Sequence, residues 1–202
     1  MKEYNYDVEK SREEFEQIYK ENIKREGSQA LFDWLVRSDF FTAPSSSKYH
    51  SAFKGGLCLH SVNCYKRFKN NIIAEYGEDY QKVISDESIA IIALLHDLCK
   101  TNFYKEDFRN VKVDGVWEKQ PCYTVDDQLP YGHGEKSVYM ISGFMRLTRE
   151  EAMAINWHMG GFDSRAQSYG NSLRTAYYQF PACPLFHIAD LQATYLDEKD
   201  SK

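Results

Sequence analysis

The sequence predicts an all-α fold, a single domain of packed helices into which one small β-hairpin is inserted. The chain has 202 residues, of which 43% are hydrophobic and 27% are charged, and this is the length and mix of one globular domain. Apolar residues recur at helical spacing along most of the chain, whereas a strand pattern occurs only near the middle. We therefore expect residues 1–202 to form one domain, with a hairpin inserted at about 104–128 and N-terminal helices at 1–40 that pack on the core.

The first third of the chain predicts three helices. From residue 8 to about residue 24 the apolar side chains that recur at helical spacing among charges are Phe15, Ile18, Tyr19 and Ile23. This spacing predicts an amphipathic surface helix. Ser28 is the expected N-cap of a second helix, and Pro44 with the three serines after it predicts a loop. The flexible pair Gly55-Gly56 precedes a third helix, at about residues 57–76.

The middle of the chain predicts a central helix and then the hairpin. Residues 89–95 are all apolar, so the helix that contains them, with Ser88 as its expected cap, is predicted to be buried on every side. An Asp-Gly pair at residues 114–115 lies between β-branched residues, which is typical of a hairpin turn. We interpret this hairpin as an insertion between helices.

The last third returns to helices after Gly132. Residues 148–151 have the S/T-x-x-E form of a capping box, and they open the helix expected to carry Trp157 and His158. A final helix is predicted to begin near Pro184, where the missing N–H is harmless, and to run through Asp190.

Composition excludes several classes of protein. The 25 basic residues are outnumbered by 30 acidic ones, so the net charge of -5 disfavours a long nucleic acid as partner. No apolar run approaches the roughly 20 residues of a membrane span, and residues 1–7 contain no secretory signal. The five cysteines are scattered without a C-x-x-C pair, which argues against disulfides and thiolate zinc sites. A cytoplasmic protein with reduced cysteines is expected.

The end of the predicted central helix carries the first candidate site. His96 and Asp97 follow the apolar run directly, and Lys100 comes one turn later. A buried carboxylate and imidazole need partners, because leaving a buried charge unpaired costs several kcal/mol, and a metal ion would serve both. On the dipeptide alone, a helix end that emerges into water is the simpler interpretation. The other histidines favour the metal, since His60 and Asp190 also lie in apolar surroundings on separate predicted helices.

Four stretches of the chain together resemble a known family. Residues 50–61 (HSAFKGGLCLHS) are similar to an H-x(4)-GGL-x-x-H opening, 94–100 (LLHDLCK) to LLHD-x-x-K, 132–137 (GHGEKS) to GH-x-x-x-S, and 188–190 (IAD) to a closing Ala-Asp. This order resembles the HD-domain superfamily of metal-dependent phosphohydrolases, in bacteria and bacteriophages, over roughly residues 40–196. The resemblance implies an HD-domain helical bundle.

The resemblance also implies a metal site. Its ligands would be His60, His96, Asp97 and Asp190, around one divalent ion that could be Mn, Fe, Zn, Co or Mg. A possible second ion would depend on His133 and His158, with Asp97 bridging the two. One departure bears on that second ion: residues 157–161 (WHMGG) have a single histidine where two-metal branches often have two. The GYP segment of cyclic dinucleotide phosphodiesterases is absent, so that substrate is not expected.

The function implied is hydrolysis of a nucleotide or similar small phosphate ester by attack of a metal-bound hydroxide. The catalytic residues would be Asp97, Lys100 and His133, and the substrate contacts are predicted to be Lys100, His50, His133, His158 and Arg165, with Arg174 a further candidate. Lys100 could instead interact with the negative C-terminal end of the helix dipole, and His50 could be an ordinary loop histidine. The alternatives are a 3′-5′ exonuclease acting on short nucleic acid, or a nucleotide-sensing module without turnover.

Three further residues have both a functional and a structural interpretation. His187 precedes Asp190 by one turn and could donate a hydrogen bond to a carboxylate behind the ligands. Glu135 is interpreted as a first-turn acid that the helix dipole favours rather than a proton carrier. Trp117 in the hairpin could cover a substrate base, or it could anchor the hairpin to the helices.

Overall fold

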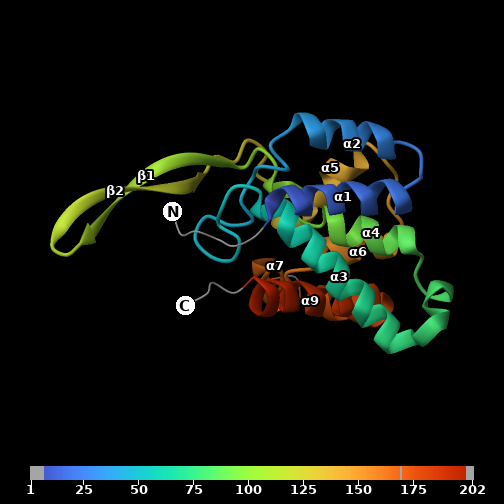
Figure 1. The fold of residues 1–202 in the computed structure, drawn as a ribbon. Helices are drawn as coiled ribbons and strands as arrows, with labels where there is room; N and C mark the ends of the chain where they lie inside the picture. Colours follow the sequence, from blue (N-terminus) through green and yellow to red (C-terminus); the bar gives the residue numbers. More distant parts are fainter. Residues whose placement is uncertain (1–6, 169, 199–202) are drawn as a thin grey trace.

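The computed structural model describes residues 7–168 and 170–198. In chain order its helices are α1 (Val8–Asn22), α2 (Ser28–Arg37), α3 (Gly56–Tyr76), α4 (Asp86–Leu95), α5 (His133–Ser142), α6 (Arg149–Asn156), α7 (Ser164–Ser168), α8 (Ser172–Gln179) and α9 (Ala182–Gln192). The strands are β1 (Tyr104–Val113) and β2 (Val116–Val125), and short helical turns span Gly77–Lys82, Leu98–Lys100, Gly160–Phe162 and Ala193–Asp197. The mostly helical fold with one small antiparallel sheet agrees with the prediction (Figure 1).

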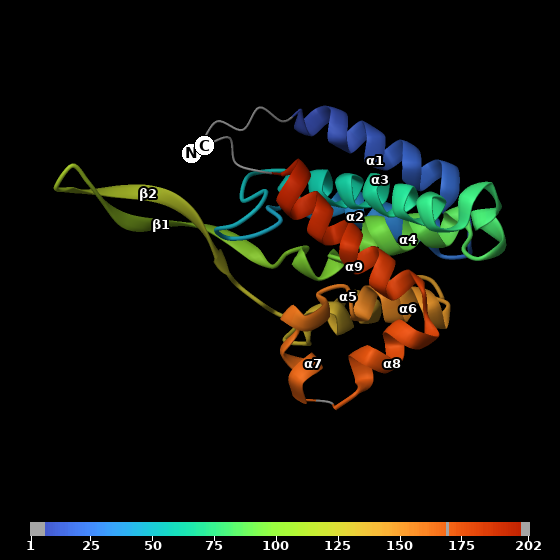
Figure 2. The ribbon, with the colours of Figure 1, turned by 90° about the horizontal axis from the view of Figure 1, so that it is seen from below.

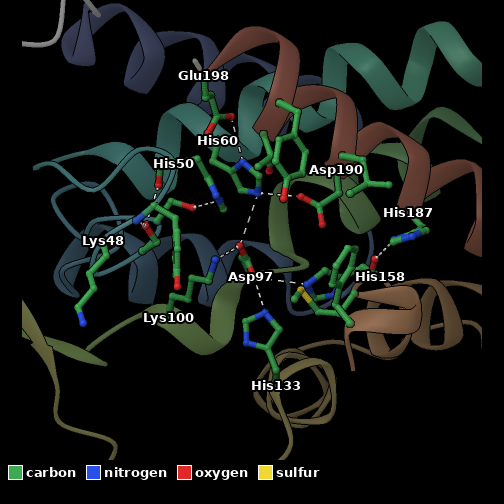
Figure 3. A pocket seen from close by; sticks show the side chains of 18 of the residues that line it. Lys48, His50, His60, Asp97, Lys100, His133, His158, His187, Asp190 and Glu198 are labelled. Atoms are coloured by element: carbon green, nitrogen blue, oxygen red, sulfur yellow. Dashed lines mark hydrogen bonds and ion pairs between the residues drawn. The ribbon is translucent and has the colours of Figure 1, made fainter. Parts of the chain in front are cut away.

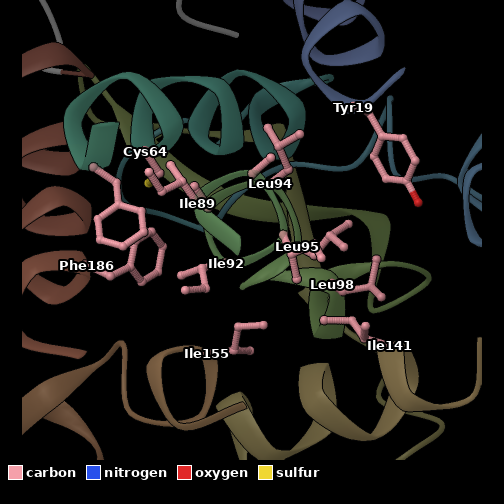
Figure 4. Packing of buried hydrophobic residues seen from close by; sticks show 14 of the residues in the cluster. Tyr19, Cys64, Ile89, Ile92, Leu94, Leu95, Leu98, Ile141, Ile155 and Phe186 are labelled. Carbon is pink, nitrogen blue, oxygen red and sulfur yellow. The ribbon is translucent and has the colours of Figure 1, made fainter. Parts of the chain in front are cut away.

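The core is built around α4, as the apolar run predicts. Every side chain from Ile89 to Leu95 is fully buried, and α3, α1 and α6 pack against this helix (Figure 4). Full burial of a leucine or isoleucine side chain contributes about 1.5–3 kcal/mol, so this helix is a major source of stability. Because His96 and Asp97 follow it directly, the core fixes the position of both. No helix among residues 7–168 and 170–198 is long and apolar enough to cross a membrane.

Two predicted helix caps are wrong, and one is confirmed. The cap of α4 is Ser85, whose hydroxyl accepts a hydrogen bond from the Ser88 N–H at 3.1 Å, so the helix begins earlier than Ser88. Ser28 is the first residue of α2 and follows the cap Gly27, whose φ of +87° suits glycine. The predicted capping box is present at the start of α6, where Thr148 and Glu151 bond each other's backbone N–H groups.

Two further helix boundaries differ slightly from the sequence-based expectation. Trp157 is the C-cap of α6, so His158 follows the helix instead of lying on it. The last helix begins at Ala182, which places Pro184 in its first turn, where a missing N–H is tolerated.

The hairpin projects away from the helices in both views (Figures 1 and 2). Strands β1 and β2 pair over ten residues each, from Tyr104 opposite Val125 to Val113 opposite Val116. The turn is the predicted Asp114-Gly115 pair, with φ values of +49° and +87° that a two-residue hairpin loop requires. Both strands lie within the predicted range of about 104–128. They form an arm about 33 Å long at the usual rise per residue.

Ion pairs and hydrogen bonds connect three segments of the helical part: the chain between α1 and α2, the start of α4 and the start of α6. The Arg25 guanidinium bonds both carboxylate oxygens of the fully buried Glu151, at 2.7 and 2.8 Å. Glu87 in the first turn of α4 accepts hydrogen bonds from the backbone N–H groups of Lys24 and Arg25. The connection between α1 and α2 is thereby attached to the starts of α4 and α6.

Candidate metal centre

Six side chains from distant parts of the sequence converge at one point, and Figure 3 labels His60, Asp97, His133, His158 and Asp190. His60 comes from α3, His96 and Asp97 from the end of α4, His133 from the start of α5, His158 from the segment after α6, and Asp190 from α9. The Nε2 atom of His60 lies 3.3 Å from His96 Nε2 and 3.3 Å from Asp190 Oδ1. The structure thus brings together all the residues that the sequence analysis assigned to the first and second metal ions.

Asp97 lies at the middle of this group, and its two oxygens face different partners. Oδ2 is 3.4 Å from His96 Nε2 and 3.6 Å from His60 Nε2. Oδ1 is 2.9 Å from His133 Nε2 and 3.6 Å from His158 Nε2. Despite these short distances, no described group makes a hydrogen bond of good geometry to the buried Oδ1. A carboxylate between two pairs of imidazole nitrogens is the arrangement expected of a ligand shared by two cations.

Nε2 of each histidine faces the centre, and Nδ1 makes a separate contact that fixes the ring. Nδ1 of His96 donates to the Ala93 carbonyl at 2.9 Å, and Nδ1 of His158 donates to the Ile155 carbonyl at 2.7 Å. His60 Nδ1 bonds a Glu198 oxygen at 3.0 Å. His133 Nδ1 lies 3.2 Å from Cys99 Sγ. Such contacts fix the ring and leave the lone pair of Nε2 directed at the centre, as in metal sites.

The charges of the centre also support a bound cation. Burial by itself would raise the pKa of Asp97, but the positive charge of Lys100 and the neighbouring His96 hold it well below its ordinary value. Burial by itself would also raise the pKa of Asp190, but the His60 ring lowers it below its ordinary value. Burial opposes protonation of His60, yet the carboxylates of Glu198 and Asp190 raise its pKa. The two ionised carboxylates, Asp97 and Asp190, are therefore balanced by cationic side chains. A divalent cation could balance the same charge, and the imidazoles that bind it would release their protons.

Glu198 is a candidate functional residue that the sequence analysis missed. Its buried carboxylate bonds His60 Nδ1, and it also accepts a hydrogen bond from Ser51 Oγ at 2.7 Å. Burial alone would raise its pKa, but the His60 charge lowers it to about 2. In a straight α-helix Glu198 would be rotated about 80° around the axis from Asp190. The wider π-helical turn at Ala193–Asp197 reduces this rotation and brings both carboxylates to the same ring.

Two cysteines lie beside the centre. Cys64 Sγ is 3.5 Å from His60 Nε2, and Cys99 Sγ lies beside His133. Burial raises the pKa of each thiol to about 12, so both are protonated in the metal-free protein. The groups of donors that could hold an ion include both sulfur atoms beside the imidazole nitrogens and carboxylate oxygens. The spacing of Cys64 four residues after His60 on one helix could have indicated this proximity.

Two close backbone approaches allow the centre to form. A Cβ atom on Gly56 would lie 2.0 Å from the Ser51 carbonyl oxygen, so only glycine lets the loop that carries His50 lie against the start of α3. A Cβ on Gly134 would lie 2.3 Å from the Asn156 carbonyl oxygen, where α5 meets the end of α6. The second approach brings His133 and His158 to the same carboxylate.

The donor set and its spacing fit a divalent metal. Metal–nitrogen and metal–oxygen bonds of about 2.1 Å place neighbouring ligand atoms about 3.0–3.4 Å apart in tetrahedral or octahedral geometry. The measured separations of 2.9–3.6 Å around Asp97 agree with this spacing. Imidazole and carboxylate ligands suit several divalent ions, and their identity is not fixed by the residues.

The centre lies in the wall of a cavity of about 880 Å³, whose lining includes His60, Asp97, His133, His158 and Asp190. The same cavity is lined by Lys48, His50 and Lys100. The Lys100 ammonium lies 2.6 Å from Asp97 Oδ2, and its pKa is raised because this carboxylate outweighs the effect of burial. Burial lowers the pKa of His50 to about 4, so its ring is neutral at pH 7.

The other predicted residues do not line this cavity, apart from His187. His187 donates through Nδ1 to the His158 carbonyl at 2.6 Å, and not to a carboxylate. The Arg165 guanidinium is engaged by Asp163, by Asn156 and by Glu135, which is 2.6 Å away. Glu135 is therefore an ion-pair partner, and Arg174 lies over the ring of Tyr178.

Trp117 neither covers the cavity of its own chain nor anchors the hairpin to the helices. It lies beside the turn at the far end of the arm and is 68% exposed.

No protein-family model, curated protein or solved structure matches this chain. The geometry of the centre and its cavity is therefore the basis on which a function can be argued.

Proposed function

We propose that the protein is a metal-dependent phosphohydrolase of the HD-domain type, which cleaves a nucleotide or a similar small phosphate ester. The observation that carries the proposal is the Asp97 carboxylate, which lies between two pairs of imidazole nitrogens at the base of a cavity with cationic residues. Divalent metals at such a site activate water and polarise a phosphoryl oxygen. The resemblance of the four sequence stretches to HD-domain enzymes supports the same assignment.

The residues around the centre have distinct roles in this reaction. His60, His96, Asp97 and Asp190 would hold one ion, and His133 and His158 would hold a second one with Asp97 as the shared ligand. Lys100 keeps a full positive charge beside Asp97, where it can stabilise the charge that develops on phosphoryl oxygens. His50 is neutral and can donate one hydrogen bond to the substrate.

The cavity supports a small substrate. Its volume of about 880 Å³ lies within the range typical of small-molecule sites. Three aromatic residues of its lining, Tyr49, Phe162 and Tyr195, expose most of their side-chain surface. Such rings can stack on a flat apolar group, and this favours a nucleotide over a simple sugar phosphate. The net charge of -5 disfavours a long strand.

The test is a metal analysis of the purified protein followed by a screen for phosphate release from mononucleotides with Mn²⁺. Asp97→Ala should lose both the bound metal and turnover and should keep its helical circular dichroism spectrum. Asp33→Ala, which removes an exposed carboxylate on α2, is the matched control and should keep both.

The outcomes separate the candidate functions. Release of phosphate from mononucleotides that disappears in the Asp97 variant supports the proposal. Stepwise shortening of a labelled oligonucleotide, with no action on mononucleotides, would indicate the exonuclease instead. Nucleotide binding without product would indicate a sensing module. Turnover retained by Asp97→Ala in added Mn²⁺ would exclude the proposed mechanism.

A further inference from the structure

The projecting arm has two chemically different faces. Residues directly opposite each other on paired strands share a face, and side chains alternate along each strand. The register therefore defines one face, here named the aromatic face, which consists of Tyr104, Glu106, Phe108, Asn110 and Lys112 with their partners Val125, Tyr123, Pro121, Lys119 and Trp117. The other face is largely polar. All the aromatic residues of the two strands lie on the aromatic face.

This face is uncovered along most of its length. Phe108 is 67% exposed, Trp117 is 68% exposed, and no described helix lies along the arm (Figures 1 and 2). An isolated two-stranded ribbon is only marginally stable in water, so packing against a partner would stabilise this arm of ten residue pairs. Clustered exposed aromatic residues are also typical of the centres of protein interfaces.

We propose that the partner is a second copy of this chain, with the two aromatic faces packed against each other around a two-fold axis at Phe108. The arms then run in opposite directions, base against tip. Phe108 and Pro121 meet their own copies at the axis. The pair Glu106 and Tyr123 of one arm meets Asn110 and Lys119 of the other arm.

The charged residues of the aromatic face favour a second copy of this chain as the partner. Glu106 and Lys119 lie one step to either side of the axis, so the packing makes two symmetric ion pairs between the arms. Neither residue has an ion-pair partner among the described residues of its own chain. The two strands together carry Lys105, Arg109, Lys112 and Lys119 against Glu106, Asp107 and Glu118, and Asp114 in the turn makes the arm neutral. A neutral arm suits self-association, whereas a nucleic-acid strand requires a basic surface.

The packing gives the dimer a direct connection to the cavity. At the outer end of the contact, Trp117 of the partner subunit lies against the pair Tyr104 and Val125. Tyr104 lines the cavity that contains the metal centre. Each subunit would therefore place an aromatic ring beside the cavity of the other one. The effect of this ring on catalysis rests on the proposed function, but the dimer itself does not.

The first test measures the dimer dissociation constant of the full chain by analytical ultracentrifugation. Glu106→Lys places two lysines face to face at each contact and should raise this constant about tenfold or more. The double variant E106K/K119E reverses both charges and should restore the wild-type constant. Glu118→Lys makes the same charge change on the other face of the arm and should have no effect.

A second test locates the axis by crosslinking. Facing sheets lie about 10 Å apart, so a short bismaleimide should join two copies of Phe108→Cys in a Cys122→Ser background. Arg109→Cys, on the polar face, should remain uncrosslinked.

Three results would overturn the proposal. They are a monomer at every concentration, a dimer that E106K leaves intact, and tighter binding of a single-stranded oligonucleotide by E106K without any dimer in the wild type. Because mass and crosslinking do not depend on turnover, a failure here is distinguishable from a failure of the phosphohydrolase assignment.

Discussion

At the scale of single residues, the His60 ring is held between two carboxylates. Glu198 bonds its Nδ1, and Asp190 faces its Nε2 at 3.3 Å. The Glu198 carboxylate accepts the proton of Nδ1, so Nε2, which faces Asp97, is the nitrogen that would lose its proton and hold a metal ion. Glu198 is therefore a positioning residue for the metal ligand, and it has no contact of its own with Asp97 among the interactions of the centre.

Replacement of Glu198 tests this role. Glu198→Ala should weaken metal binding about 10- to 100-fold, because the ring of His60 loses the group that orients it. Glu198→Gln keeps an acceptor oxygen and should retain most of the affinity. Titration calorimetry with Mn²⁺ on the metal-free protein measures both. Asp197→Ala, which removes a neighbouring carboxylate bonded to Arg67, is the control, and equal affinities for all four proteins would exclude a positioning role.

The ligands and Glu198 differ in how far the sequence could predict them. His60, His96, Asp97 and Asp190 are polar residues within apolar helical segments, which made them candidates, and the resemblance to the HD-domain superfamily implied that they are ligands. Glu198 lies in the charged stretch at 197–200, where an acidic residue is unremarkable. Its inward direction depends on a π-helical turn, which no periodicity in the sequence indicates.

At the scale of elements, the start of α4 is attached to the chain between α1 and α2 by Glu87. Burial alone would raise the pKa of Glu87, but hydrogen bonds from the Lys24 and Arg25 backbone N–H groups lower it. A carboxylate whose pKa is lowered by folding stabilises the folded state above its ordinary pKa. This contribution is lost as the pH falls through the folded-state value.

Glu87→Gln should therefore lower the free energy of unfolding by about 1 kcal/mol at pH 7, because it removes the charge from these hydrogen bonds. The difference from wild type should begin to shrink as the pH falls below about 4.3, the ordinary pKa of a glutamate, and should close below the lowered pKa of the folded state, where the wild-type carboxylate is also neutral. Urea unfolding at pH 7 and at pH 3.5 measures both values. Glu13→Gln, on the exposed face of α1, should show no difference at either pH, and a gap for E87Q that is constant with pH would contradict this account.

The element boundaries show where sequence reasoning was limited. The sequence predicted the central helix, the hairpin turn and the capping box, because each has a local physical cause. The caps at Ser28 and Ser88 were wrong because another residue a short distance before each one competed for the same role. The hairpin at about 104–128 was predicted from its turn and the β-branched residues beside it, and its pairing extends through Lys105, Glu106 and Asp107, which lack that pattern.

At the scale of the whole molecule, the centre joins segments from nearly the full length of the chain. Its candidate ligands come from α3, the end of α4, α5, the segment after α6, and α9. A metal that binds this set stabilises the folded state, because the unfolded chain does not hold the ligands together. The long-range convergence of these segments could not be predicted from spacing in the sequence, and it depends on the packing around α4.

Thermal unfolding measures this stabilisation. Adding Mn²⁺ at about 100 times its dissociation constant to chelator-treated protein should contribute about 2.7 kcal/mol, which raises Tm by about 5–10 °C for a domain of this size. Asp190→Asn should lose most of this rise, whereas Asp33→Asn on the exposed side of α2 should keep it. A rise of equal size in the Asp190 variant would place the ion elsewhere.

The arm and the metal centre are directly connected along the chain. Strand β1 begins four residues after Lys100, and β2 ends eight residues before His133. Lys100 lies beside Oδ2 of Asp97 and His133 lies beside Oδ1, so the segments on both sides of the arm lead to residues that contact the same carboxylate. The inserted hairpin therefore starts and ends in parts of the chain that the centre itself holds in place.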